Sequence, residues 1–175
     1  ANIVYTLLDI IEESKLEPCD LHLEVTESAY AEDAEQIIET VKRLRSMSFL
    51  VEMDDFGTGY SSLNMLSTLP IDVLKLDMKF ISTAFSEEKD THMLEIIIEI
   101  ARHISAPVVA EGVETEEQMT ALKKIGCDMV QGYYFSPPVP AEKFAGFLKD
   151  AKQELASKEA ARPKQSRSKN AVSGE

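Results

Sequence analysis

Five short apolar segments alternate with longer segments of helical periodicity along the chain. Each apolar segment is a few residues long and rich in Val, Leu, Ile or Met, as expected for strands that are buried on both faces. We predict these strands at Leu21–Thr26, Leu50–Asp54, Val73–Asp77, Pro107–Glu111 and Met129–Gln131.

The segments between the predicted strands carry apolar residues at helical spacing. The first ends before Pro18, and another has a stripe that runs from Ile37 to Met47. Thr115 followed by Gln118 predicts a capping box that opens a helix, and Gly126 would end that helix. Alternation of strands and helices predicts parallel strands with right-handed crossovers. It does not distinguish a closed barrel from an open sheet.

The composition is that of a globular protein, with 175 residues, 44% hydrophobic and 28% charged. No apolar run approaches 18 residues, so we expect no transmembrane segment. No secretory leader pattern is present, and we expect a cytoplasmic location, or a cytoplasmic part of a larger protein. Cys19 and Cys127 form no CxxC motif and are interpreted as buried, reduced thiols.

The net charge of −13 is unevenly distributed. Residues 151–175 carry six basic and three acidic side chains, which leaves −16 for residues 1–150. Such an acidic body repels polyanions, so we expect no nucleic acid polymer as a partner, and a small phosphodiester would need bridging metal ions. Large apolar residues almost disappear after about residue 155. We therefore predict one domain over residues 1–150 and a basic, disordered tail over residues 151–175.

Charged or amide side chains stand at or just after the end of every predicted strand. In a β/α barrel these strand ends meet on one face, where active sites are built. Several carboxylates would repel one another there unless a cation stood between them, and Mg²⁺ or Mn²⁺ suits such an all-oxygen site. Two such ions beside a lysine are typical of two-metal phosphodiester hydrolysis. The candidates are Glu24, Thr26, Glu27, Asp54, Asp55, Lys75, Asp77, Glu111, Glu114 and Gln131.

Structural explanations for the same residues remain open. An acidic residue at a strand end can simply cap the next helix, as in any α/β domain. Lys75 lies inside the apolar run Val73–Leu76, where a lysine is unusual unless it is paired or lies on an edge strand. The pattern gives no account of Glu52, and His22 is interpreted as a structural or surface residue.

Five motifs in this order resemble those of EAL domains, bacterial phosphodiesterases specific for cyclic di-GMP. The matching segments are Glu24–Glu27 (ExTE), Asp54–Leu63 (DDFGTGYSSL), Leu74–Asp77 (KID), Ala110–Thr115 (AEGVET) and Gln131–Pro138 (QGYxFSxP). The resemblance covers roughly residues 3–150. It implies a TIM-like (β/α) barrel that hydrolyses cyclic di-GMP to the linear dinucleotide with two divalent metal ions, Mg²⁺ or Mn²⁺.

The resemblance also implies roles by position. Glu24, Asp54 and Asp55 match metal ligands, with Asp55 at the second metal. Lys75 matches a lysine that contacts the metal-bound water or the substrate phosphate. Glu111 matches a glutamate that acts as a base or as a metal ligand. The substrate-side positions are Asp77, Glu114 and Gln131. Glu27 matches a glutamate that supports the loop. By resemblance, the loop over residues 54–66 and the helix that follows it form a homodimer contact. Its matching residues are Phe56, Gly57, Thr58, Gly59, Tyr60 and Ser61.

The chain also departs from the family. It contains neither the Glu-Ala-Leu motif nor the Asn-x-Ser strand that follows it, and both supply metal ligands. An EAL barrel has eight strands, and the pattern predicts five. We therefore expect an incomplete barrel with an exposed sheet edge that a second copy could cover. We also expect weak or absent metal binding and negligible hydrolysis by the chain alone. The alternative is an inactive EAL-derived binding or dimerisation module.

Overall fold

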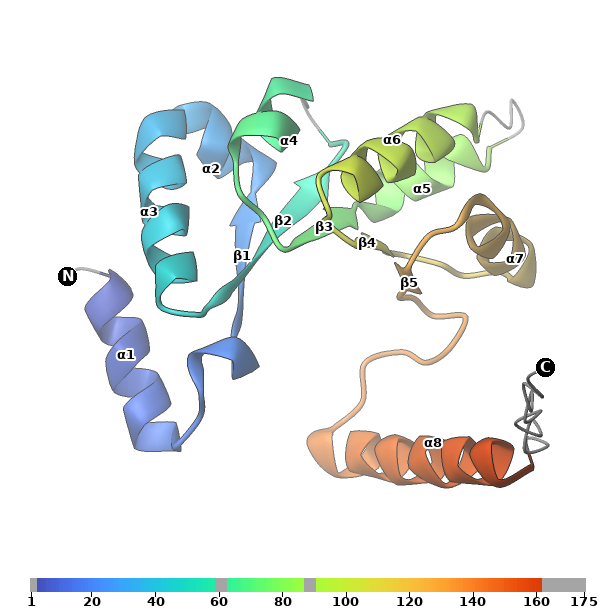
Figure 1. Cartoon of the computed structure of the whole chain (residues 1–175). Coiled ribbons are helices and arrows are strands. Elements are labelled where there is room, and N and C mark those ends of the chain that lie inside the picture. Colours follow the sequence, from blue (N-terminus) through green and yellow to red (C-terminus); the bar gives the residue numbers. More distant parts are fainter. Residues whose placement is uncertain (1–2, 59–62, 87–90, 162–175) are drawn as a thin grey trace, which may run out of the picture. The chain divides into compact units, whose positions relative to one another are not determined.

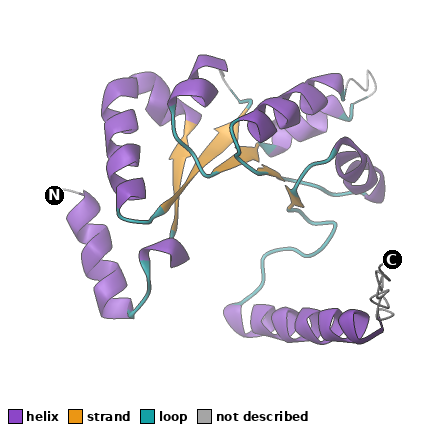
Figure 2. Ribbon diagram, viewed as in Figure 1, coloured by secondary structure: helices purple, strands orange, loops and turns teal. Residues whose placement is uncertain are grey.

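Five parallel strands form the sheet in the computed structural model, which describes residues 3–58, 63–86 and 91–161 (Figures 1 and 2). Each matches its predicted segment to within two residues at either end, and neighbours in the chain are neighbours in the sheet. The strands are β1 (His22–Thr26), β2 (Leu50–Phe56), β3 (Val73–Leu76), β4 (Val108–Ala110) and β5 (Met129–Val130).

The sequential strand order answers the question that the sequence pattern left open. A doubly wound sheet reverses its strand order at a switch point, whereas a β/α barrel adds each strand beside the previous one. The order β1-β2-β3-β4-β5, with every pair parallel, is the barrel order. The predicted fold class, an incomplete TIM-like barrel, is therefore confirmed.

Helices follow β1, β2, β3 and β4 in residues 1–136, the first of two compact units. A single helix, α8 (Ala141–Ala161), is described in the second unit, residues 137–175. None of the helices within the described ranges is long and apolar enough to cross a membrane. The helical elements of the first unit are α1 (Ile3–Ser14), η1 (Pro18–Asp20), α2 (Glu27–Glu32), α3 (Ala34–Ser46), α4 (Leu63–Thr68), α5 (Met78–Ala84), α6 (His92–His103) and α7 (Glu116–Ile125).

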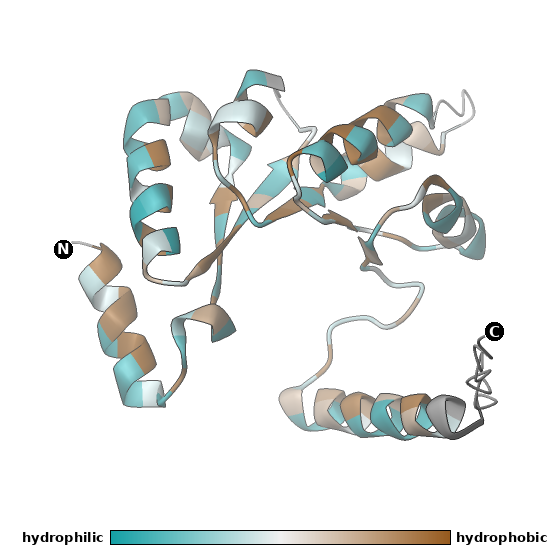
Figure 3. Cartoon of the chain, in the orientation of Figure 1, coloured by the Kyte–Doolittle hydropathy of each residue, from teal (hydrophilic) through white to brown (hydrophobic). Residues whose placement is uncertain are grey.

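One face of the sheet is apolar and packs against these helices. Val51, Met53, Leu74 and Leu76 are fully buried, because alternate residues of each strand point to the same face. They share one core cluster with apolar residues of α1 and α3 to α7. Figure 3 shows hydrophobic and hydrophilic residues alternating around α3 and α6, as expected for helices with one face on a core. The intervening strand residues point to the opposite face, which carries the charged side chains.

Helix α7 begins and ends as its sequence predicts. The Thr115 hydroxyl accepts from the Gln118 amide at 3.2 Å, and the Gln118 side chain accepts from the Thr115 amide, which completes the capping box. Gly126 takes the left-handed conformation, φ 82°, at the C-cap. These caps fix the helix that leads into β5.

The predicted disordered tail is wrong for residues 151–161, which continue α8. Ala, Lys, Glu, Gln and Leu favour a helix in the absence of a packed core, and the prediction considered only the missing core. Residues 162–175 lie outside the described residues. The first compact unit ends at Ser136 and α8 runs through residue 150, so nothing in the structure marks the predicted boundary there.

Both cysteines are free thiols, in different surroundings. Cys19 lies exposed on the short helix η1, so its predicted burial is wrong. Cys127 is partly buried, and its Sγ donates to the carbonyl of Met129 at 3.1 Å. Burial raises the pKa of the Cys127 thiol, which makes it a poor nucleophile.

Two glycines provide a matched test of this packing. A Cβ on Gly132 would lie 2.1 Å from the backbone oxygen of Val113, whereas a Cβ on Gly146 would meet no atom of the described chain within 4 Å beyond its own helix. Gly132→Ala should lower the free energy of unfolding by about 1–3 kcal/mol. Gly146→Ala should stabilise α8 by about 0.5–1 kcal/mol. Urea denaturation followed by circular dichroism measures both, and equal effects would contradict this account of Gly132.

Candidate functional site

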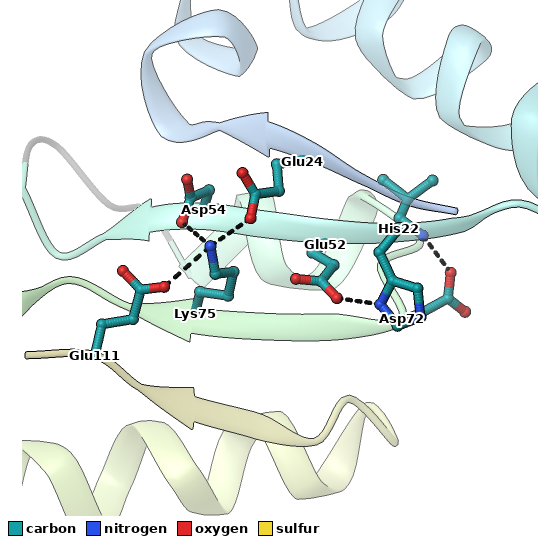
Figure 4. Close-up of polar contacts among 8 residues, drawn as sticks. His22, Glu24, Glu52, Asp54, Asp72, Lys75 and Glu111 are labelled. Atoms are coloured by element: carbon teal, nitrogen blue, oxygen red, sulfur yellow. Dashed lines mark hydrogen bonds and ion pairs between the residues drawn. The ribbon is translucent and has the colours of Figure 1, made fainter. Parts of the chain in front are cut away.

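Three carboxylates from neighbouring strand ends meet at the ammonium group of Lys75 (Figure 4). Nζ lies 2.5 Å from Glu24 Oε1, 2.9 Å from Asp54 Oδ1 and 3.0 Å from Glu111 Oε1. The Lys75 side chain is only 12% exposed, while Glu24 is 51% exposed. Three carboxylates face one ammonium group, so the cluster carries an excess of negative charge.

The parallel register brings these residues together. Glu24, Asp54 and Lys75 lie on β1, β2 and β3 respectively, with side chains on the face opposite the core. Glu111 directly follows β4, and its amide donates to the carbonyl of Leu76 at 3.0 Å, which extends the pairing past the end of the strand. The cluster therefore stands at the carboxyl ends of four adjacent strands, where a β/α barrel builds its site.

Lys75 lies on β3, the middle strand of the sheet, so the edge-strand explanation of this residue is wrong. Burial lowers the pKa of Lys75, but hydrogen bonds to Glu24, Asp54 and Glu111 outweigh it and hold the pKa above its usual value. Lys75 is therefore a permanent cation at neutral pH, and it balances part of the carboxylate charge.

A bulge ends β2 beside the cluster. The pairing with β3 shifts between Met53 and Phe56, and Asp55 takes a left-handed conformation, φ 57°. The carbonyl of Asp55 accepts from the amide and the hydroxyl of Thr58, which tightens the turn. A bulge of this kind redirects consecutive side chains. Asp55 thus lies near the end of β2 beside the cluster, and its carboxylate is not among those that contact Lys75.

A residue of α2, Glu27, holds the start of the loop that follows β2. Glu27 is 6% exposed, and its Oε2 accepts from the amide of Gly57 at 3.3 Å, as expected for a side chain that supports this loop. Gly57 has φ 99°, and an added Cβ would lie 2.8 Å from the ring of Phe80. Phe56 is buried beneath the turn, and Thr58 is held by Asp55. Gly59, Tyr60 and Ser61 lie outside the described residues.

The predicted substrate-side residues line a separate cavity of about 520 Å³ at the ends of β3 to β5. Asp77, Glu114 and Gln131 share its wall with Glu111, so the cavity adjoins the charged cluster. The Asp77 carboxylate also accepts from the Lys79 amide at 2.7 Å and caps α5, so the capping explanation holds for this residue as well. The rest of the lining is Met78, Gly112, Gly132 and Tyr133.

The donor set of the cluster suits a hard divalent cation. Glu24, Asp54 and Glu111 offer only carboxylate oxygens, the ligands that Mg²⁺ and Mn²⁺ prefer. Within the described residues, however, no three acidic, histidine or cysteine side chains are already grouped as a metal site. The three carboxylates contact the ammonium of Lys75 instead. The ligand atoms of these residues therefore suit such an ion, but the side chains would have to move away from Lys75 to bind it.

Sequence reasoning missed one pair on the same sheet face. His22 Nδ1 lies 2.5 Å from Glu52 Oε1, two residues before Glu24 and Asp54 on their strands (Figure 4). The Glu52 side chain is 13% exposed, far less than the 48% of His22. Alternation along β2 could have placed Glu52 beside Asp54, because residues two apart share a face. That His22 is the partner of Glu52 could be known only from the register in which β1 pairs with β2.

Comparisons with known proteins agree on the family. The EAL domain model matches residues 1–138. The cyclic di-GMP phosphodiesterase NbdA of Pseudomonas aeruginosa is 41% identical over 149 residues, which is 85% of this chain and 19% of NbdA. The chain thus spans about a fifth of the length of this curated relative.

Solved structures of other proteins are similar to this chain in both fold and sequence. The PaMucR phosphodiesterase in complex with cyclic di-GMP has a TM-score of 0.77 and 38% identity, covering 82% of this chain and 58% of that one. Klebsiella pneumoniae BlrP1 in complex with manganese and cyclic di-GMP has a TM-score of 0.71 and 32% identity, covering 77% and 34%. With a family match over 138 of its 175 residues and the barrel order of its strands, the chain belongs to the EAL domain family.

Proposed function

We propose that this chain carries the phosphate- and metal-handling part of a cyclic di-GMP phosphodiesterase site. The reaction is the hydrolysis of cyclic di-GMP to the linear dinucleotide. The contact of Lys75 with carboxylates from three other strand ends supports this proposal most directly, because it gathers cation ligands and a fixed positive charge at one point. The phosphodiesterase names and cyclic di-GMP complexes of similar proteins support the choice of substrate.

In this proposal Glu24, Asp54 and Asp55 hold the divalent ions, Mg²⁺ or Mn²⁺. Manganese in the BlrP1 complex supports the ion class. Bound ions of this kind polarise phosphoryl oxygens and acidify water. Lys75 donates to a non-bridging phosphate oxygen and offsets the charge that develops there. Glu111 accepts a proton from the attacking water as the water oxygen bonds to phosphorus, and the bond from phosphorus to the ribose oxygen breaks. The released ribose oxygen takes a proton from solvent and leaves as a hydroxyl group.

Asp77, Glu114 and Gln131 face the substrate in the adjoining cavity. Carboxylate and amide oxygens accept hydrogen bonds, which suits the amino and imino groups of guanine. Since Glu111 belongs to both the cavity and the cluster, one substrate can place its base in the former and its phosphate at the latter.

A second candidate is an inactive EAL-derived binding or dimerisation module. Within the described part of the chain, β1 and β5 each pair on one side only, and such edges can add a strand from another molecule. A homodimer could form there, or through the segment 54–66 with α4. In either case the site of a single chain stays incomplete, and we propose that it turns over cyclic di-GMP poorly by itself.

The isolated chain should convert cyclic di-GMP to the linear dinucleotide at least about 100-fold more slowly than a complete EAL domain, because site groups from further strands are missing. Chromatography of the products in Mg²⁺ or Mn²⁺ measures this rate, with the PaMucR phosphodiesterase as reference. Ordinary turnover would refute the proposed inactivity. Calorimetry on the same samples tests whether cyclic di-GMP still binds.

A graft separates the chemistry of the site from the incompleteness of the chain. Residues 3–136 would replace the aligned segment of the PaMucR phosphodiesterase, and the graft should hydrolyse cyclic di-GMP. Lys75→Met in the graft should lower kcat by about 100-fold or more, since a buried charge facing the phosphate is lost.

Lys79→Met is the matched control for this graft, because Lys79 is an exposed lysine of α5, four residues further along. It should leave kcat within about twofold, as expected for a surface substitution. A graft that folds and keeps its activity with Lys75→Met would remove Lys75 from the proposed mechanism.

The raised pKa of Lys75 predicts how its contribution to stability depends on pH. A group whose folded-state pKa exceeds its unfolded value contributes fully below the unfolded value, 10.5, and loses that contribution as pH rises through the folded value. The difference in unfolding free energy between the chain and Lys75→Met should therefore be constant from neutral pH to about 10 and change only above it. Urea titrations over this range measure it, and a change centred near neutral pH would contradict the prediction.

A further inference from the structure

We infer that His22 is a positioning residue, which holds Glu52 away from Lys75 so that Glu24 occupies the cluster. The inference concerns the arrangement of side chains in this chain. Only its consequence for metal binding rests on the proposed function.

Two glutamates stand side by side on β1 and β2. The register pairs Glu24 directly with Glu52, on the same sheet face. Like charges in directly opposed positions destabilise a sheet. The structure separates them by giving each a different partner: Lys75 binds Glu24, and His22 binds Glu52. The two carboxylates are drawn apart along the strands.

Of these two glutamates, Lys75 contacts the one whose backbone is more distant. Glu52 pairs with Val73, two residues before Lys75 on the adjacent strand. With strands about 4.8 Å apart and a rise of about 3.3 Å per residue, the Cα atoms of Glu52 and Lys75 are about 8 Å apart. Glu24 lies one strand further away, at about 12 Å on the same flat lattice. Backbone position alone therefore favours Glu52 as the partner of Lys75.

The hydrogen bond from His22 explains why Glu52 does not take that position. His22 pairs with Leu50, two residues before Glu52, so its ring draws the Glu52 carboxylate toward the amino ends of the strands. A carboxylate only accepts hydrogen bonds, so the imidazole donates from Nδ1 in this contact. Glu52 is 13% exposed and has few directions in which to turn. Without His22, Glu52 still has a cation on the same sheet face, Lys75 of the adjacent strand.

Crystal structures of the full chain and of His22→Val test the inference directly. Valine keeps the preference for a strand and removes the donor. We expect Glu52 to contact Lys75 Nζ in the variant and Glu24 to leave it. In the double variant His22→Val/Glu52→Gln, Glu24 should return to Lys75, since the competing charge is gone. A variant structure with Glu24 still on Lys75 and Glu52 apart from it would overturn the inference.

Calorimetric titration with Mn²⁺ tests the consequence for the cluster. His22→Val should weaken Mn²⁺ binding about fivefold to tenfold, and the double variant should restore it to within about twofold. A merely structural role of His22 would leave the double variant as weak as the single one. If the unaltered chain binds Mn²⁺ too weakly to measure, the same variants are titrated in the graft on the PaMucR phosphodiesterase. A graft that binds no Mn²⁺ removes the metal part of the proposed function, while the crystal structures still decide the role of His22.

His92→Val is the matched control. His92 forms the same type of pair, with Glu95 at 3.5 Å, on the exposed surface of α6. It should alter neither the Lys75 contacts nor the Mn²⁺ affinity. An equal loss of affinity in His92→Val would show that removal of any histidine is sufficient, and would overturn the inference.

Discussion

The site depends on how a parallel sheet accommodates several charges on one face. The carboxylates of Glu24, Asp54 and Glu111 could not approach one another without a cation, and Lys75 supplies it from the central strand. Burial alone would favour a neutral lysine, but three hydrogen bonds outweigh it and keep the ammonium charged. Removal of Lys75 would leave three carboxylates in repulsion. Removal of one carboxylate would lower that repulsion and leave the other two on the ammonium group, so Lys75 is the member on which the arrangement most depends.

The sequence predicted the elements and the cluster because both follow from local patterns. Buried strands have short apolar runs, and helices have their own period and caps, as Thr115 and Gln118 show. Lys75 and Asp54 stood out as charges within or at the end of such runs. The pair of His22 and Glu52 was missed because its two members are 30 residues apart and meet only through the register of β1 and β2.

The extent of α8 was missed for a different reason. Composition after residue 150 indicates that no core can form, but it does not exclude a helix that exposes most of its residues. Asp77 shows a further limit of sequence reasoning. The capping and substrate-side interpretations were weighed as alternatives, whereas the structure places one carboxylate at the N-cap of α5 and in the wall of the cavity. A fixed cap holds a side chain in one orientation, which is also what a binding group requires.

The members of the cluster lie on β1, β2 and β3 and directly after β4, and these strands are adjacent and paired in the described chain. The charged centre is therefore assembled by local register and needs no strand from elsewhere. If the chain lacks turnover, the cause lies in ligands and substrate contacts that further strands would add, and not in a collapsed centre. Assembly of the charged cluster and binding of ligands are therefore two separate requirements. Lys75 and its carboxylate partners need only neighbouring strands, whereas the proposed coordination of metal ions and substrate would also use groups from the remaining strands of a closed barrel.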